Sequence, residues 1–287
     1  MNPTRGAMLW MVAFVALWVL VEVISTWFHL AYSPFEVVWG RYAAHLAIMV
    51  AIFGWRDPLA LVRTRRPLLQ IGRSMLMLVM PAAWVLAMER GLDVDTVLSL
   101  FGVSPLLICV LAVLLLNERA TRGIWISAIV VSVGALFCLS LQGPLPRTGV
   151  AAALVCAGSF SLYCVMTRML TTETLRANMF YTALGVFAAL TLYMPKVWVT
   201  PTPHDAVVMF LVGAVGLVSL LALDRAAETA PVFNGGAMVD TRLLTLTGGV
   251  LVGRHPDLHY AVGLAVIVAG TICALSLARS PAMSVQQ

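Results

Sequence analysis

Ten long apolar stretches, separated by short polar or Pro/Gly-containing connections, occupy almost the whole chain. Each contains about 20 residues, the length that a helix needs to cross the hydrocarbon core of a bilayer. They cover approximately residues 7–29, 34–54, 68–88, 94–116, 122–141, 149–170, 178–197, 205–223, 230–252 and 258–278. Only 11% of the 287 residues are charged, against about 25% in soluble domains. The sequence therefore predicts an all-α integral membrane protein with ten transmembrane helices, the first retained rather than cleaved as a signal peptide.

The basic residues are distributed unevenly among the connections. With the N-terminus in the cytoplasm, twelve of the 18 Lys and Arg residues fall on the inner side, four on the outer side, and Arg41 and Arg242 within the membrane. This bias is the positive-inside pattern of membrane proteins. It predicts that both termini are cytoplasmic, and it explains the net charge of +5 without a nucleic-acid partner. We expect a multi-pass protein of the cell (inner or plasma) membrane.

A weak internal repeat divides the chain into two halves of five helices. An offset of 136 residues aligns the last helix of each half through Val130/Val266, Gly134/Gly270, Leu139/Leu275 and Ser140/Ser276. Because five is an odd number, the two halves would have opposite orientations in the membrane. Inverted repeats are common in secondary transporters, whose sites lie between the repeats near the midplane. We expect repeats at 1–141 and 149–278, followed by a short cytoplasmic tail at 279–287.

Charged residues inside apolar stretches are the strongest functional signal. Glu22 and Arg41 lie at equal distances from the tip of the first predicted hairpin, so antiparallel helices would hold them at similar depth. An ion pair there would lower the cost of burying either charge. The pair could be structural and fix helix register. We favour a pair that lines a substrate pathway, because ionisable groups within membranes usually face one.

Two further residues near this hairpin are weaker candidates. Glu36 lies at the start of the second helix, where an acid could equally be a solvated residue that favours the helix dipole. His45 lies one turn after Arg41 and could share its face, although a helical histidine is more often a packing residue. Both are retained as candidates for substrate binding or ion coupling.

The ninth stretch carries the second group of candidates. Asp240 lies near its middle, and Asn234-Gly235-Gly236 precedes it with glycines that would allow close packing or a local break. Arg242 follows two residues later, about 200° around the helix, so it cannot share a narrow cavity with Asp240. We expect Asp240 to face the cavity, and Arg242 to pair with another helix or to extend toward an interface.

Aromatic residues offer stacking surfaces, although most membrane Trp and Tyr belong to interfacial belts. Trp84 and Tyr163 lie deeper in their stretches and are candidates for stacking on a flat substrate. The sequence lacks the motifs of phosphate loops, zinc proteases and serine hydrolases. His255-x-Asp257-x-His259 is read as a polar connection rather than a metal site, and the five cysteines as packing residues. We expect no cofactor, no metal and no enzymatic activity.

Several segments carry a resemblance to a known family. They are Ser33-Pro34-Phe35-Glu36-Val37 followed by Arg41, Arg65-Arg66-Pro67 with Arg73 and Trp84, Pro105-Leu106, and Leu116-Asn117-Glu118-Arg119. With them the chain resembles the drug/metabolite transporter superfamily, in its ten-helix branch of two EamA repeats. It is most similar to the group of S-adenosylmethionine uptake carriers and riboflavin transporters, in which acidic residues match Glu22 and Asp240. The second repeat departs from the pattern at Thr241, Arg242 and Gly253-Arg254-His255-Pro256.

The residues and the resemblance together favour a secondary transporter that moves a small organic metabolite by alternating access. The expected substrate is S-adenosylmethionine-like, amino-acid-derived or flavin-like, and a proton or another ion could be coupled. Two acids and one arginine among the favoured charges suit a cationic or zwitterionic molecule. The alternative is a lipid-handling (flippase-like) or structural membrane protein, and an enzyme is the weakest interpretation. We expect a monomer or homodimer in the lipid bilayer.

Overall fold

The computed structural model describes residues 3–26, 32–55, 57–139, 144–231 and 258–277, and all their regular elements are helices. The helices are α1 (Pro3–Thr26), α2 (Pro34–Met49, continued by the π-helical turn Val50–Gly54), α3 (Pro58–Val62), α4 (Pro67–Glu89), α5 (Val94–Phe101), α6 (Ser104–Leu116), α7 (Arg122–Phe137), α8 (Arg147–Met169), α9 (Leu175–Thr191), a 3-10 turn (Met194–Lys196), α10 (Pro203–Thr229) and α13 (Leu258–Leu277). The prediction of an all-helical membrane protein is confirmed. Nine of the ten predicted stretches coincide with these elements, and the ninth lies outside the described residues.

Within the described part, six helical segments are long and apolar enough to cross a membrane, and α7 and α13 are shorter apolar helices. One segment, Val94–Leu116, is interrupted between α5 and α6 at Gly102-Val103. Gly102 lies so close to Ala135 of α7 that a Cβ atom there would overlap the alanine side chain. The interruption thus brings the α5–α6 junction into direct contact with α7.

Helix starts follow from local sequence. Proline occupies the first turn of α2, α3, α4, α6 and α10, where its missing N–H costs no helical hydrogen bond. Asp57, Asp93, Thr121, Thr174 and Thr202 are N-caps whose side chains accept backbone N–H bonds. These proline, Asp and Thr residues lie in the short polar connections. Each connection therefore ends one apolar stretch and starts the next helix.

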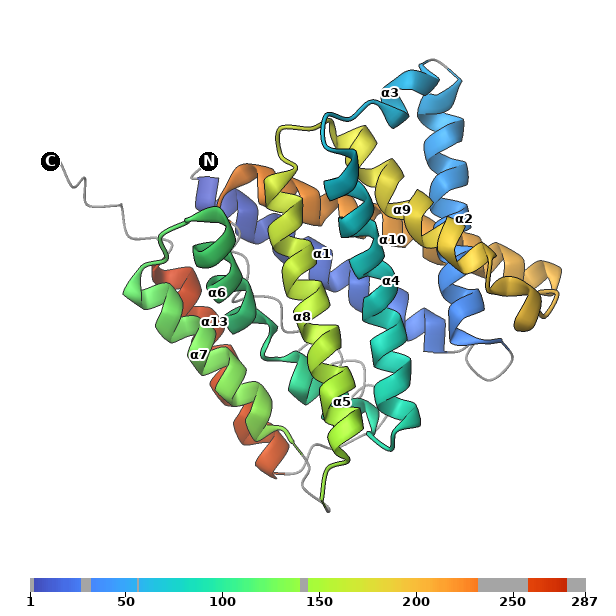
Figure 1. Cartoon of the computed structure of the whole chain (residues 1–287). Coiled ribbons are helices and arrows are strands. Elements are labelled where there is room, and N and C mark those ends of the chain that lie inside the picture. The colour runs from blue at the N-terminus through green and yellow to red at the C-terminus, as the bar shows by residue number, and fades with distance from the viewer. Residues whose placement is uncertain (1–2, 27–31, 56, 140–143, 232–257, 278–287) are drawn as a thin grey trace, which may run out of the picture.

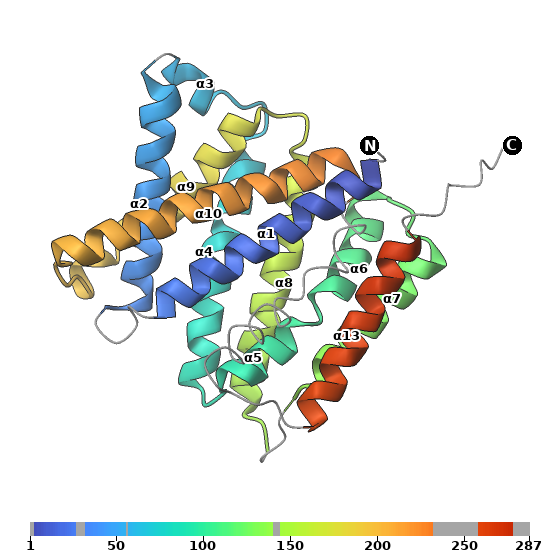
Figure 2. The ribbon, with the colours of Figure 1, turned by 180° about the vertical axis from the view of Figure 1, so that it is seen from behind.

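The helices pack in pairs that join the two halves of the chain. Figures 1 and 2 show α1 running beside α10, α4 beside α8, and α7 beside α13, and each pair is in extensive contact. Helix α2 also packs against α9 and α10, and α4 against α9. The core is therefore built by contacts between the halves, with one large apolar cluster that draws side chains from both.

The helix starts are consistent with an internal repeat. Helices α4 and α10 begin 136 residues apart, at Pro67 and Pro203, and so do α7 and α13, at Arg122 and Leu258. Helices α2 and α9 begin 141 residues apart, at Pro34 and Leu175. The contact of α1 with α10 then has its counterpart in the contact of α8 with α4. The boundaries 1–141 and 149–278 stay a prediction.

Glycines allow the pair α7 and α13 to approach closely. A Cβ atom on Gly134 would lie 2.9 Å from the Ile267 nitrogen, and one on Gly270 would lie 2.8 Å from a methyl carbon of Val131. The Ser127 hydroxyl donates to the Gly270 carbonyl at 2.6 Å. Small residues with a hydroxyl bond between backbones are a typical way to associate helices in membranes. Gly134 and Gly270, which the sequence repeat aligns, therefore serve the same contact.

Candidate functional site

Helices α1, α2 and α10 meet around Arg41, whose position depends on two glycines of α10. A Cβ atom on Gly213 would lie 2.6 Å from the Arg41 carbonyl oxygen, closer than packing permits. A Cβ atom on Gly216 would lie 3.4 Å from Cδ of the Arg41 side chain. The absence of a side chain at Gly213 therefore lets α2 lie against α10, and Gly216 is within ordinary van der Waals distance of the Arg41 side chain.

The predicted pairing of Glu22 with Arg41 is confirmed. Arg41 Nη1 lies 3.5 Å from Glu22 Oε1, a contact longer than a well-formed hydrogen bond. The Arg41 side chain is 8% exposed and that of Glu22 is 51% exposed. The guanidinium carbon lies 5.1 Å from the ring centre of Trp18 and 5.2 Å from that of Tyr42. Arg41 is therefore held between two aromatic rings, while Glu22 keeps much of its carboxylate accessible.

One buried polar atom next to Arg41, Nε2 of His45, has no hydrogen-bond partner among the described residues. The hydroxyl of Tyr42 is also buried there and interacts with Arg41. The two rings lie 6.2 Å apart at an interplanar angle of 21°. With Trp18 and Arg41 they line a small gap closed on the α10 side by Gly216. The structure thus places His45 beside Arg41 as expected, with hydrogen-bonding capacity left over.

Glu36 takes a different position from the solvated helix-start acid considered above. It is buried, and its two carboxylate oxygens accept the backbone N–H of Val199 at 3.2 Å each. Nearby, the Tyr32 hydroxyl donates to Asp205 at 2.6 Å. That bond raises the pKa of Tyr32, so the phenol remains a donor at neutral pH. Glu36 therefore fastens the start of α2 to the connection between α9 and α10.

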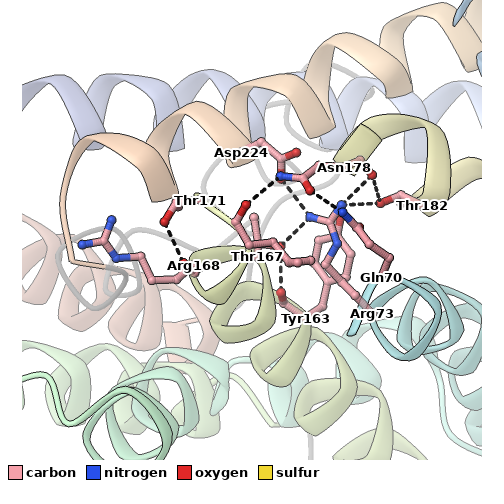
Figure 3. Close-up of polar contacts among 10 residues, drawn as sticks. Gln70, Arg73, Tyr163, Thr167, Arg168, Thr171, Asn178, Thr182 and Asp224 are labelled. Carbon is pink, nitrogen blue, oxygen red and sulfur yellow. Dashed lines mark hydrogen bonds and ion pairs between the residues drawn. The ribbon is translucent and has the colours of Figure 1, made fainter. Parts of the chain in front are cut away.

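A second cluster of polar residues, which we call the Arg73 cluster, joins α4 to α8, α9 and α10. Its members are Gln70, Arg73, Tyr163, Thr167, Asn178, Thr182 and Asp224. Figure 3 shows the Arg73 guanidinium among side chains from the other three helices. Nη1 donates to the Thr167 hydroxyl and to Asp224 Oδ1, both at 3.1 Å. Nη2 donates to the Asn178 carbonyl at 2.6 Å and to the Thr182 hydroxyl at 2.8 Å.

The Arg73 cluster is closed to solvent. The side chain of Arg73 is 0% exposed and that of Asp224 is 3% exposed. The Tyr163 ring lies below the guanidinium, with its centre 5.2 Å from the guanidinium carbon. Gln70 donates to the Asn178 side-chain oxygen at 2.6 Å. A buried ion pair persists in an apolar environment only with such additional bonds, because the desolvation of both charges is costly.

A further set of bonds lies near the same ends of these helices. Arg168, near the end of α8, pairs with Glu118 at 3.1 Å and donates to the Ala227 carbonyl of α10 at 2.6 Å (Figure 3 shows Arg168 beside the cluster). The Glu173 carboxylate accepts the backbone N–H of Arg65. These bonds connect the first half of the chain to the second where α4 and α9 begin and α8 and α10 end.

The other predicted site residues are distributed differently. Tyr163 belongs to the Arg73 cluster, below a guanidinium. Trp84 is half-buried and packs against two apolar clusters, and no described contact joins it to Glu22 or Arg41. Asn234, Asp240 and Arg242 lie outside the described residues. The binding or coupling roles of all these residues stay predictions.

Sequence reasoning missed the centre of the Arg73 cluster. Arg73 was counted with the basic residues of the inner side and not among the charges within the membrane, but it lies in the second turn of α4 and is fully buried. Asp224 was placed just beyond a stretch that ended at 223, whereas α10 continues to Thr229. The residues 224–229, Asp-Arg-Ala-Ala-Glu-Thr, contain good helix formers. They could have signalled the continuation, but the pairing partner, 151 residues away, could not be read from the sequence.

Comparison with known proteins agrees with this architecture. Residues 5–140 match the model of the EamA-like transporter family. The match covers the first of the two halves of the chain. The S-adenosylmethionine uptake transporter of Rickettsia prowazekii (strain Madrid E) is 21% identical to this chain over 261 residues, which cover 88% of this chain and 86% of that protein. The transporter of the same name from Rickettsia bellii (strain RML369-C) is 22% identical over 259 residues, or 88% and 87% of the two chains.

A solved crystal structure shares the fold of this chain. It superposes with a TM-score of 0.74 at 22% sequence identity and covers 96% of this chain and 98% of the other. The family match of the first half and the shared fold therefore agree with the resemblance found in the sequence. Together with the related proteins, they support the expectation of a membrane transporter.

Proposed function

We propose that this protein moves a small organic metabolite with a zwitterionic head group across the cell membrane by alternating access. The observation that carries the proposal is the pair formed by Glu22 and Arg41 inside the membrane, in which the carboxylate is half exposed. A structural pair would be expected to have a shorter contact and additional hydrogen bonds, as Arg73 has in its cluster. The 3.5 Å contact leaves bonding capacity on both groups, and the half-exposed Glu22 carboxylate is the one open to a new partner, while Arg41 is buried.

The chemistry of the pair indicates the class of substrate. A guanidinium binds a carboxylate through two parallel N–H bonds, and a carboxylate binds an ammonium or sulfonium cation. A molecule with an α-amino acid group would therefore place its carboxylate on Arg41 and its cationic group on Glu22. The Trp18 ring beside Arg41 adds a stacking surface for a flat substituent. These features suit an S-adenosylmethionine-like or amino-acid-derived substrate better than a neutral flavin.

The relatives support the same class. The Rickettsia proteins are named for the uptake of S-adenosylmethionine, which is both zwitterionic and cationic. Identity of 21–22% supports a related substrate and leaves its identity to experiment. We further propose that Asp240 lines the same pathway, and that both termini lie in the cytoplasm of a cell whose inner or plasma membrane holds the protein.

Ligand-induced stabilisation tests the proposal. The purified protein would be heated with S-adenosylmethionine, amino acids, nucleosides, riboflavin and anionic lipid in turn, because a ligand of the native state raises the apparent melting temperature. We expect stabilisation by a molecule with an α-amino acid group and its loss in Glu22→Gln. The matched control is Glu89→Gln, an exposed acid at the end of α4. Stabilisation by lipid alone would contradict the proposal and favour a lipid-handling protein.

A further inference from the structure

The two residues of the buried ion pair, Arg73 and Asp224, make very different numbers of hydrogen bonds. Arg73 has three acceptors besides Asp224, namely Thr167, Thr182 and the Asn178 carbonyl. Asp224 receives a single bond on Oδ1, and its other oxygen, Oδ2, is buried without any partner among the described residues. An ionised carboxylate oxygen left bare in an apolar environment is costly. A proton on Oδ2 would neutralise that charge. Arg73 also leaves one buried N–H, that of Nε, without a partner among the described residues, but its two terminal nitrogens donate four bonds.

The pair also lies where it can control access. Arg73 belongs to the first half of the chain, and Asp224 with the other acceptors belongs to the second half. All four helices have an end here, since α4 and α9 begin and α8 and α10 finish near the cluster. The distribution of arginines predicts that this end faces the cytoplasm. Separation of α10 from α4 at this pair would open the bundle at that end.

We propose that Asp224 is a proton-binding carboxylate whose protonation releases α10 from Arg73 and opens this end of the bundle. This inference rests on the proposed transport function, for which it supplies a coupling ion. The step is a simple acid–base reaction, in which a proton from the adjacent aqueous phase adds to Oδ2 and the site gains one positive charge. The neutral acid loses its Coulomb attraction to the guanidinium. Arg73 keeps its three other hydrogen-bond acceptors, so the ion pair can separate while the guanidinium stays hydrogen-bonded.

The other ionisable groups around Asp224 do not provide an alternative. Helix α8 presents the neutral phenol of Tyr163 and the thiol of Cys164. It also carries Arg168, which is paired with Glu118 and donates to the Ala227 carbonyl of α10. Helix α9 contributes Asn178 and Thr182, which do not titrate. On α10 itself, Arg225 and Glu228 pair with each other at 2.9 Å on the surface. Of the two other helices against α10, the described side chains of α1 include one ionisable group, Glu22, which is paired with Arg41 of α2. The remaining ionisable groups of α2 are Glu36, Tyr42 and His45.

Cysteine labelling tests the proposal independently of any substrate. In a variant without its native cysteines, Ala227→Cys would report on this end, because Ala227 is buried there on α10. Ala87→Cys, buried in the apolar cluster at the other end of α4, would report on the opposite end. The detergent-purified full chain would be treated with a charged maleimide from pH 8 to pH 5.5. Each rate would be divided by the rate for the SDS-denatured protein at the same pH, which removes the effect of thiol ionisation.

We expect the normalised labelling of Ala227→Cys to rise several-fold as the pH falls, while Ala87→Cys stays protected. Asp224→Asn, which mimics the protonated acid, should label fast at every pH, and the control Glu89→Gln, an exposed acid at the far end of α4, should behave like its parent. A pH response that persists in Asp224→Asn would overturn the proposal, as would equal labelling at both ends, which indicates unfolding. If the normalised labelling of Ala227→Cys does not change with pH while Asp224 is intact, the proposal is overturned as well. If the ligand screen finds no substrate, the labelling results can still be interpreted, because labelling requires no substrate.

Discussion

Substitution of Arg73 by methionine should be among the most destabilising changes in the described part of the chain. The substitution leaves the Asp224 carboxylate buried at 3% exposure with no positive partner, and it removes all four bonds donated by the guanidinium. Removal of one partner from a buried ion pair costs about 3–5 kcal/mol. We therefore expect Arg73→Met to lower the free energy of unfolding by about 3–5 kcal/mol.

The double variant Arg73→Met/Asp224→Leu separates the pair from simple loss of packing. Because apolar replacement of a whole buried pair is often neutral or stabilising, it should be more stable than Arg73→Met by at least about 1 kcal/mol. Arg225→Met is the matched control, since it breaks an exposed pair with Glu228 at 2.9 Å. Exposed pairs contribute about 0–1 kcal/mol. The control should therefore remain close to the parent protein.

The measurement is SDS-titration unfolding in detergent micelles, followed by the helical circular dichroism signal. Two results would refute the reasoning. One is equal destabilisation by Arg73→Met and Arg225→Met. The other is strict additivity of Arg73→Met and Asp224→Leu, which would show that the two side chains do not depend on each other in the folded state.

Substitutions at four positions test local features of the fold by the same unfolding measurement. Asn117 ends α6 at φ +53°, so Asn117→Ala should cost about 1 kcal/mol and Asn117→Gly almost nothing. Gly213→Ala should cost about 1–3 kcal/mol because its Cβ would lie 2.6 Å from a carbonyl of α2. Gly158→Ala, in α8 with open space around it, should instead stabilise by about 0.5–1 kcal/mol. Tyr32→Phe removes the 2.6 Å bond to Asp205 and should cost about 0.5–1.5 kcal/mol. For Tyr32→Phe, a loss of stability well above about 1.5 kcal/mol would contradict a purely local role for this hydrogen bond.

Much of the helical framework could be predicted because its signals are local. The apolar stretches, the prolines in first turns and the capping Asp and Thr residues lie next to the helices that they define. The pairing of Glu22 with Arg41 was also predictable, since a single hairpin connects their helices and fixes their relative depth. The interruption at Gly102 was missed, because it depends on contact with Ala135 of another helix.

The Arg73 cluster was not predictable for the same physical reason. A charged residue near the end of an apolar stretch can mark the edge of the membrane or the centre of a buried network, and hydropathy gives both the same value. Arg73 and Asp224 were therefore assigned to the edges of their stretches. Their burial follows from contacts between the two halves of the chain, such as the bonds from Arg73 to Thr167 and Asn178. Only the arrangement of four helices distinguishes the two cases.

Transport by the reconstituted protein tests the central claim most directly. Proteoliposomes would be assayed for uptake of radiolabelled S-adenosylmethionine, with unlabelled amino acids and riboflavin as competitors. We expect saturable uptake that competes with molecules bearing an α-amino acid group. It should fall about tenfold or more in Glu22→Gln, since a bond to a charged group contributes about 1.5–3 kcal/mol, and remain unchanged in Glu89→Gln. Undiminished transport in Glu22→Gln, or competition by riboflavin but not by amino acids, would contradict the account.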